Sequence, residues 1–160
     1  DVQAQLAPGL RVDASYAFLD GHFGEFLTVD PDHPELGVQD LGALDRTLPR
    51  SPRESFSVRS TYTHGVGAKG ELTWFGEVAY KSRIYHDVFN EPLNSQGGFT
   101  LVNARVSYQP DEASWNVALY GRNLTDRLWY QTGGRNTPFF GSMHLPAEPR
   151  TYGIELGAKW

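Results

Sequence analysis

Alternation of apolar and polar residues at period two is the feature that most constrains how this chain can fold. The alternation is clearest in "TYGIELGAKW", where one side carries Tyr152, Ile154, Leu156, Ala158 and Trp160. Successive side chains of a β-strand point to opposite faces of a sheet, so this pattern places an apolar set on one face and a polar set on the other. Helical periodicity is scarce elsewhere in the chain, and the sequence therefore predicts an all-β protein.

Seven segments carry the alternation, and they recur through the whole chain. Proline cannot donate a hydrogen bond within a sheet and should be excluded from strand interiors. None of the 10 prolines falls inside the predicted strands, which cover 1–6, 9–24, 53–64, 70–87, 99–109, 115–130 and 150–160. We therefore expect an antiparallel, up-and-down meander of about seven strands.

The connections between these strands alternate between short and long. The short ones are 7–8, 65–69 and 110–114, and the long ones are 25–52, 88–98 and 131–149. In a meander every second connection lies at the same end of the sheet, so one end carries tight turns and the other carries loops. Outer-membrane β-barrels have this asymmetry, with short periplasmic turns and longer extracellular loops.

Aromatic residues indicate which face meets which solvent. In a membrane barrel the apolar face contacts lipid, and aromatic rings gather at the headgroup level at both edges of the apolar band. Five aromatic residues lie within a few residues of the predicted short-turn end and form a candidate girdle: Tyr62, Trp74, Tyr108, Trp115 and Trp160. The pattern favours strands whose apolar face contacts lipid; a soluble β-sandwich with the apolar face in its core is the open alternative.

Composition and charge exclude several classes of function. The net charge of -5 leaves no basic stripe for nucleic acid, and the absence of cysteine excludes disulfides and thiolate metal sites. No run approaches the about 18 apolar residues of a membrane-spanning helix. The five histidines show no zinc-binding spacing, so we predict neither a metal nor a cofactor. Ser60 and His64 lie on the predicted lipid-facing side of their strand and Ser57 lies on the opposite side. No catalytic triad is therefore evident, and we expect no enzyme.

Three stretches of the chain resemble a known family. "FTLVNARVSYQP", "LYGRNLTDRLWYQ" and "PRTYGIELGAKW" together resemble the C-terminal barrel region of TonB-dependent outer-membrane receptors. The family motif is Asn-Leu-Thr-Asp, present here as Asn123, Leu124, Thr125 and Asp126. The last ten residues also resemble the C-terminal sorting strand that the barrel-assembly machinery is thought to recognise.

The resemblance implies a 22-stranded transmembrane β-barrel with an N-terminal plug domain, in the outer membrane of a Gram-negative bacterium. Such receptors import scarce solutes such as ferric siderophores, with energy supplied through TonB and its inner-membrane complex. Residues 1–160 are then expected to be the C-terminal portion of the barrel domain, without the plug or the TonB box. A passive porin or a small outer-membrane barrel is the alternative.

The number of strands indicates that further strands are needed to close the barrel. If the last strand runs toward the short-turn end, the first of seven strands also does, which places Asp1 at the long-loop edge. A closed bacterial barrel has an even number of strands. Unpaired strand edges in hydrocarbon cost several kcal/mol per backbone group, so further strands of the same protein are expected to complete the barrel.

The resemblance also suggests where site residues lie. Ligand contacts are expected from loops and from polar residues facing the lumen near the outer end: Lys81, Arg83, Tyr85, Arg135 and Asn136. Arg83 and Arg135 could bind an anionic small-molecule ligand through two parallel hydrogen bonds. For Asn123 to Asp126 we expect a structural role, as a bulge or twist near the outer rim.

Overall fold

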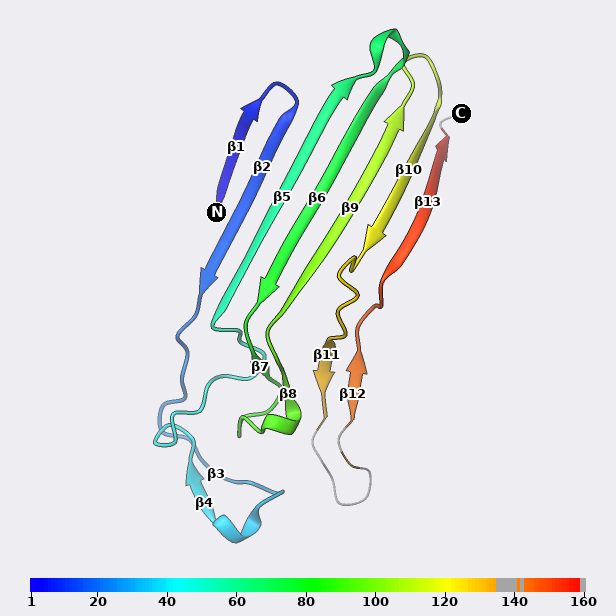
Figure 1. Ribbon diagram of the computed structural model, residues 1–160. Helices are drawn as coiled ribbons and strands as arrows, with labels where there is room; N and C mark the ends of the chain where they lie inside the picture. The colour runs from blue at the N-terminus through cyan, green and yellow to red at the C-terminus, as the bar shows by residue number, and fades with distance from the viewer. Residues whose placement is uncertain (135–140, 142, 159–160) are drawn as a thin grey trace.

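The computed structural model describes residues 1–134, 141 and 143–158, and its main feature is one sheet of seven long strands. The seven strands follow one another in chain order as an antiparallel meander (Figure 1). They are β1 (Val2–Ala7), β2 (Leu10–Phe18), β5 (Glu54–Gly65), β6 (Glu71–Lys81), β9 (Phe99–Gln109), β10 (Trp115–Arg122) and β13 (Thr151–Ala158). The predicted all-β, up-and-down fold with seven strands is confirmed.

Turns of very different length lie at the two ends of this sheet. The short-turn end carries residues 8–9, 66–70 and 110–114, and the long-loop end carries residues 19–53, 82–98 and 123–150. Gly9 makes the first short turn possible: its φ is 77°, and a Cβ there would collide with the carbonyl oxygen of Thr63. The first and last strands both run toward the short-turn end (Figure 1).

Three strands end earlier than the alternation predicts. The strands predicted at 9–24, 70–87 and 115–130 end at Phe18, Lys81 and Arg122. In each case the chain leaves the large sheet six to eight residues before the end of the predicted segment. The strict alternation also stops there, as where apolar Leu19 follows Phe18, so the predicted strands are too long. β1 also pairs only with Leu10 to Ala14, and Asp1 therefore lies opposite the middle of β2 and not at the long-loop edge.

Three small hairpins lie at the long-loop end of the sheet. They pair β3 (Leu27–Val29) with β4 (Val38–Asp40), β7 (Ile84–Tyr85) with β8 (Ser95–Gln96), and β11 (Tyr130–Gly133) with β12 (His144–Pro146). Short 3₁₀ helices at Pro34–Leu36 and Pro92–Asn94 lie in two of their connections, and a third at Gly67–Lys69 lies in a short turn. Among the described residues, no helix has the length and apolarity needed to cross a membrane.

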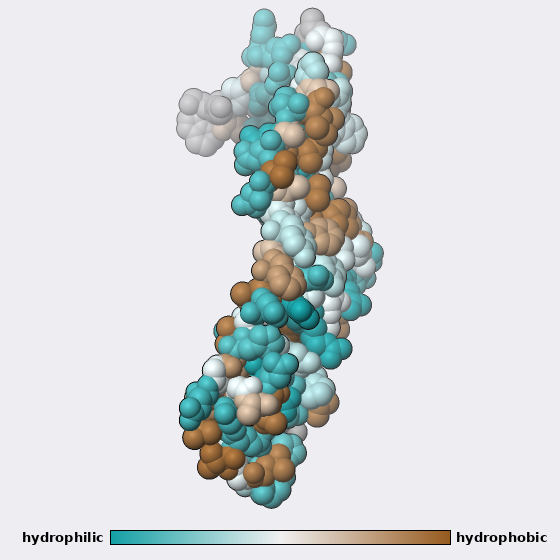
Figure 2. All heavy atoms as spheres, turned by 90° about the vertical axis from the view of Figure 1, so that its left-hand side faces the viewer, coloured by the Kyte–Doolittle hydropathy of each residue, from teal (hydrophilic) through white to brown (hydrophobic). Residues whose placement is uncertain are grey.

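The register sorts the side chains of the large sheet into two faces. Val12, Ser60, Gly76 and Ala104 follow one line of paired residues across the sheet, and the neighbouring positions Asp13, Arg59, Glu77 and Asn103 follow the next. Within the part of the chain that the structure describes, no second layer covers either face. In the upper part of Figure 2, hydrophobic residues line one side of the narrow sheet and hydrophilic residues the other.

The apolar face is therefore open. Its largest side chains are strongly exposed, including Tyr16 at 62%, Leu119 at 57%, Ile154 at 69% and Leu156 at 80%. A soluble β-sandwich would bury such residues between two sheets. Among the described residues, the buried hydrophobic ones are instead few, and three of the four (Leu41, Phe89 and Phe99) lie in or next to the long loops.

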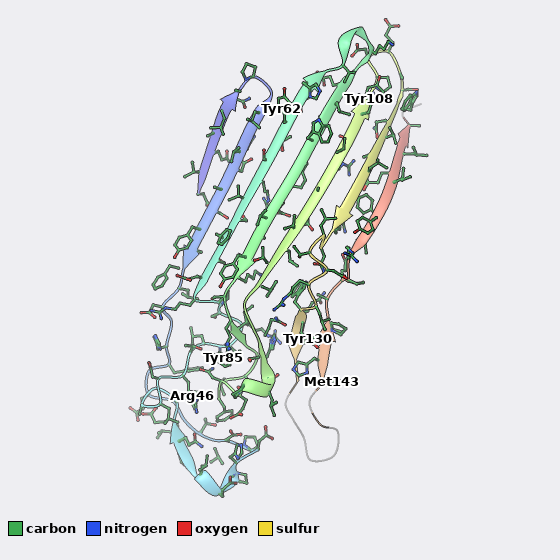
Figure 3. The ribbon with its side chains drawn as sticks, in the orientation of Figure 1. Arg46, Tyr62, Tyr85, Tyr108, Tyr130 and Met143 are labelled. Carbon is green, nitrogen blue, oxygen red and sulfur yellow. The ribbon has the colours of Figure 1, made fainter. Side chains whose placement is uncertain are left out.

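The predicted girdle residues that the structure describes lie together at the short-turn end. Tyr62 pairs with Trp74 across β5 and β6, and the Tyr108 ring meets the Trp115 ring edge-on at 6.2 Å. Tyr62 and Tyr108 are labelled at this end in Figure 3. Trp160 lies outside the described residues, and the contact of these rings with lipid headgroups stays a prediction.

Candidate functional site

Hydrogen bonds between the three long loops make them one unit, which we call the loop junction. It comprises segment 47–50 and the two hairpins β7–β8 and β11–β12. Arg50 connects all three parts: its amide donates to the Tyr85 carbonyl at 2.8 Å, and its guanidinium donates to Thr132 Oγ1 at 3.1 Å. The first loop therefore cannot move away from either hairpin without losing a hydrogen bond.

Buried amide side chains add further links. The Asn90 side chain accepts from the Thr47 amide at 2.8 Å and donates back to the Thr47 carbonyl at 3.0 Å. Gln96 Oε1 accepts from the Tyr130 amide at 3.0 Å, which joins β8 to β11. Asn90 and Gln96 are less than a tenth exposed, and buried polar side chains that bond to backbone hold a single arrangement of the chain.

Gly133 marks the closest approach within the junction. A Cβ at this position would collide with Asn94 Oδ1 and would lie 3.0 Å from His86 Cδ2 and 3.3 Å from His144 Cδ2. The absence of a side chain thus lets β11 lie against β7 and the 3₁₀ turn before β8. His144 Nε2 meets the Leu93 carbonyl at 3.1 Å, which ties β12 to the same turn.

His86 lies at the centre of this packing in an unusual state. Both its ring nitrogens are buried and find no hydrogen-bond partner among the described residues, and the same holds for Asn94 Oδ1. Burial lowers the pKa of His86, and the positive charge of Arg50 and the neighbouring His144 lower it further, while Asp87 opposes them. The geometry therefore favours a neutral imidazole.

Asn123 organises the rim of the sheet where β10 ends. Its φ is 49°, and its Oδ1 accepts from the Arg127 amide at 2.9 Å while its Nδ2 donates to the Arg127 carbonyl at 3.0 Å. The Asp126 amide donates to the Asn123 carbonyl at 2.8 Å and closes a four-residue turn. β10 pairs with β9 and β13 without a register shift, so a turn that ends the strand stands in place of the expected bulge.

The other motif residues tie this turn to the neighbouring strands. Leu124 donates its amide to the Val102 carbonyl at 2.8 Å. Thr125 Oγ1 donates to the Thr100 carbonyl at 3.2 Å, and Asp126 forms an ion pair with Arg150 at 3.1 Å. The motif thus connects β9, β10 and the segment leading to β13.

Ion pairs neutralise the charged face of the sheet. Glu77 accepts from Arg59 at 2.7 Å and from Asn103 at 2.8 Å, a network across β5, β6 and β9. Arg105 pairs with Glu155 at 2.5 Å between β9 and β13. Shallow hollows line this face, one of them bounded by Phe75, Glu77, Arg105, Tyr120, Arg122 and Glu155. Paired charges of both signs suit a wall in contact with water or with a polar partner.

The structure places the five predicted ligand residues as follows. Lys81 ends β6 and is exposed, and Arg83 is exposed at the break before β7. Tyr85 lies in the separate strand β7, so the alternation of β6 does not extend to it. The expectation that its side chain faces the lumen therefore has no support from that alternation. Arg135 and Asn136 lie outside the described residues. Whether any of these residues binds a ligand stays a prediction.

The terminal strand alternates as predicted. Tyr152, Ile154, Leu156 and Ala158 pair with Gly121, Leu119, Val117 and Trp115 on the apolar face. Its recognition by the assembly machinery stays a prediction.

Sequence reasoning missed the residues of the loop junction. No periodic pattern marks four of them, which are Arg50, Asn90, Asn94 and Gln96. The spacing of His86 and His144 in the chain does not indicate a site. The one available signal was the amide-rich "NEPLNSQGG", because buried Asn and Gln often bond to backbone in loops.

The residues weighed for catalysis are not assembled. Ser57 bonds to Ser15 at 2.7 Å on the charged face, while the His64 ring stacks on Tyr62 on the apolar face. Among residues 1–134, 141 and 143–158, no three His, Cys, Asp or Glu side chains form a group that could hold a metal ion.

Three solved structures share this fold. The ferric yersiniabactin uptake receptor FyuA from Yersinia pestis has a TM-score of 0.72 at 19% identity, over 98% of this chain and 22% of that one. The siderophore receptor PiuA from Acinetobacter baumannii has a TM-score of 0.72 at 17% identity, over 96% and 20%. BauA, the ferric preacinetobactin receptor from the same species, has a TM-score of 0.64 at 18% identity, over 98% and 20%.

These likenesses show the fold alone, since the identities are low, and the chain spans about a fifth of each receptor's length. No curated protein sequence matches the chain. The family model described as "TonB dependent receptor-like, beta-barrel" matches residues 1–124, which cover six of the seven long strands. The meander with one open apolar face, the unequal turns and this match agree, and the chain belongs to the TonB-dependent receptor-like β-barrel family.

Proposed function

We propose that residues 1–160 form the C-terminal portion of the barrel domain of an outer-membrane importer in a Gram-negative bacterium. The uncovered apolar face of the sheet carries this proposal. Leu119, Ile154 and Leu156 are each more than half exposed, and lipid chains are the solvent in which such a face is stable. The opposite face, with its paired charges, then lines a wet lumen.

Further strands of the same protein complete the proposed barrel. Among the residues that the structure describes, the backbone of β1 and of β13 is paired on one side only. Unpaired edges are not tolerated in hydrocarbon, so each needs a neighbour, and the similar receptors are about five times longer than this chain. A barrel of 22 strands with a plug domain would supply both neighbours and a polar partner for the charged face.

The proposed cargo is a ferric siderophore, imported with energy supplied through TonB and its inner-membrane complex. Family membership supports the mechanism, and the similarity to FyuA, PiuA and BauA supports the cargo class. The barrel-assembly machinery is the proposed partner during insertion, through the terminal strand β13.

Growth under iron limitation tests this function. A strain in which the full gene is deleted should fail to grow when a ferric siderophore is the iron source, and the intact gene should restore growth. A copy lacking only its TonB-binding segment should reach the outer membrane but should not restore growth. Equal growth of the deletion strain on every siderophore offered would reject import of this cargo class.

Affinity measurements test the proposed ligand contacts. Arg83→Ala and Arg135→Ala in the full-length receptor should each weaken binding of an anionic ferric siderophore by about tenfold or more, because a hydrogen bond to a charged group contributes about 1.5–3 kcal/mol. Arg11→Ala, near the short-turn end, is the matched control. Unchanged affinity in both loop variants would remove these residues from the site.

A further inference from the structure

Within the loop junction, a group of buried polar side-chain atoms has no hydrogen-bond partner among the described residues, and this group lies where separate loops meet. His86 Nδ1, His86 Nε2 and Asn94 Oδ1 belong to it, and the contact with Gly133 brings β11 onto the same spot. The Asn94 side chain is 4% exposed, and its Nδ2 donates to Asp87 Oδ2 at 2.7 Å. Because both ring nitrogens of His86 are buried beside Gly133, little room is left for water to solvate a new charge on the imidazole.

The charged groups around His86 disfavour a positive charge on its imidazole. Arg50 approaches from the first loop and His144 from β12, and both repel an imidazolium. Asp87, on the segment after β7, is a carboxylate that favours the charged imidazole, and its oxygens already accept from the Glu91 amide at 3.2 Å and from Asn94. Asn94, on the 3₁₀ turn, carries no charge.

We propose that His86 is a proton-sensitive latch of the long loops: neutral, it lets β7–β8, β11–β12 and segment 47–50 pack together, and protonated, it separates them. The partially open state hydrates the imidazolium, which the closed state cannot do. This inference concerns loop conformation and adds to the proposed function a control over access to the outer end of the barrel.

The direction of the pH effect follows from the lowered pKa of His86. His86 titrates below the ordinary histidine pKa of about 6.5 when the junction is closed, and near that value when it is open. Above about pH 7 both states are neutral, and the junction has its full stability. As pH falls below about 6.5 the open state takes up a proton that the closed state refuses, so opening is favoured.

Hydrogen exchange on the full-length receptor in lipid vesicles tests the latch. The amides of Arg50 and Tyr130 donate across the junction, and their exchange rates, divided by the intrinsic rate at each pH, report its opening. We expect their protection to be constant from pH 8.5 to 7 and to fall below pH 6.5, by up to about tenfold for each unit of pKa depression. The Val66 amide in a short turn should not change.

Two variants separate His86 from other titrating groups. His86→Gln is neutral at every pH, and protection of Arg50 and Tyr130 should then be independent of pH. His33→Gln is the matched control, because His33 is an exposed loop histidine paired with Glu35, and this variant should keep the fall. Persistence of the fall in His86→Gln would overturn the proposal.

A measurement on the unaltered receptor covers the case in which His86→Gln does not fold. Exchange of the imidazole C2 hydrogen gives the pKa of each histidine, and a value for His86 at or above about 6.5 would overturn the latch. Constant or rising protection at low pH would do the same. None of these readouts needs a siderophore or TonB, so failure of the latch is distinguishable from failure of the proposed import.

Discussion

Single residues of this chain settle where strands end. Asn123 does so by adopting a left-handed backbone and by satisfying the Arg127 amide and carbonyl with its own side chain. It is 5% exposed, so water cannot replace these bonds. The side chain thus performs the same task as a backbone turn, which explains why an Asn with its two donors and an acceptor suits the position better than an apolar residue.

Replacing Asn123 should destabilise the rim. Asn123→Ala leaves the Arg127 amide without its acceptor and forces Ala into a left-handed conformation, and we expect a loss of about 2–4 kcal/mol in the free energy of unfolding. Urea unfolding of the full-length receptor from lipid vesicles measures it. Asn123→Gly, which tolerates this backbone but also lacks the side-chain hydrogen bonds, should lose stability by a smaller amount than Asn123→Ala. No loss in Asn123→Gly would show that the side-chain hydrogen bonds are unimportant.

Packing between elements, rather than strand propensity, holds the long-loop end together. The hairpins β7–β8 and β11–β12 are too short to be stable alone, since isolated two-stranded hairpins are marginal in water. They persist because buried amides and the close contact at Gly133 join them. The packed arrangement of the loops therefore depends on the contacts between them and not on the individual hairpins.

Gly133→Ala tests this coupling. Its methyl group would collide with Asn94 Oδ1, and overpacking of this kind costs about 1–3 kcal/mol. Protection of the Tyr130 amide against hydrogen exchange should fall accordingly, while β6 and β9 stay unchanged. Gly97→Ala is the matched control, because a Cβ at Gly97 meets nothing within 4 Å. A loss of protection in the control alone would contradict the role given to Gly133.

The described part of the large sheet is a single layer with two chemically different faces. Its ion pairs, such as Glu77 with Arg59, lie on one face, and its exposed Tyr, Leu and Ile side chains lie on the other. No compact core links the two ends of the sheet within the described residues. Stability must therefore come from the strand ladder and, in the proposed barrel, from the surrounding lipid.

Val78→Arg and Ala79→Arg test which face meets lipid. The two residues are adjacent on β6, so they lie at almost the same depth but on opposite faces. In folding titrations of the full-length receptor into lipid vesicles, Val78→Arg should lose about 2–4 kcal/mol, and Ala79→Arg should lose less than half of that. A larger loss for Ala79→Arg would reverse the assignment of the faces.

The sequence by itself determined the strands, their order, their two faces and the unequal turns. These features are local: alternation depends only on neighbouring residues, and Gly or Pro marks each short turn. It also located the Asn123 motif at the rim. It placed the ends of β2, β6 and β10 six to eight residues too late, because the mixed polar and apolar residues after Phe18, Lys81 and Arg122 do not show by themselves that the backbone leaves the sheet.

Only the tertiary structure decided the loop junction. Three separate loops contribute to it: Arg50 comes from the first, His86 and Asn94 from the second, and Gly133 and His144 from the third, and no periodic pattern points to a contact between them. Their contacts depend on which loops the seven-stranded sheet brings to one end and on how closely two hairpins can approach. A periodic pattern records the environment of a residue's own strand, whereas a contact between loops depends on the geometry of the whole sheet.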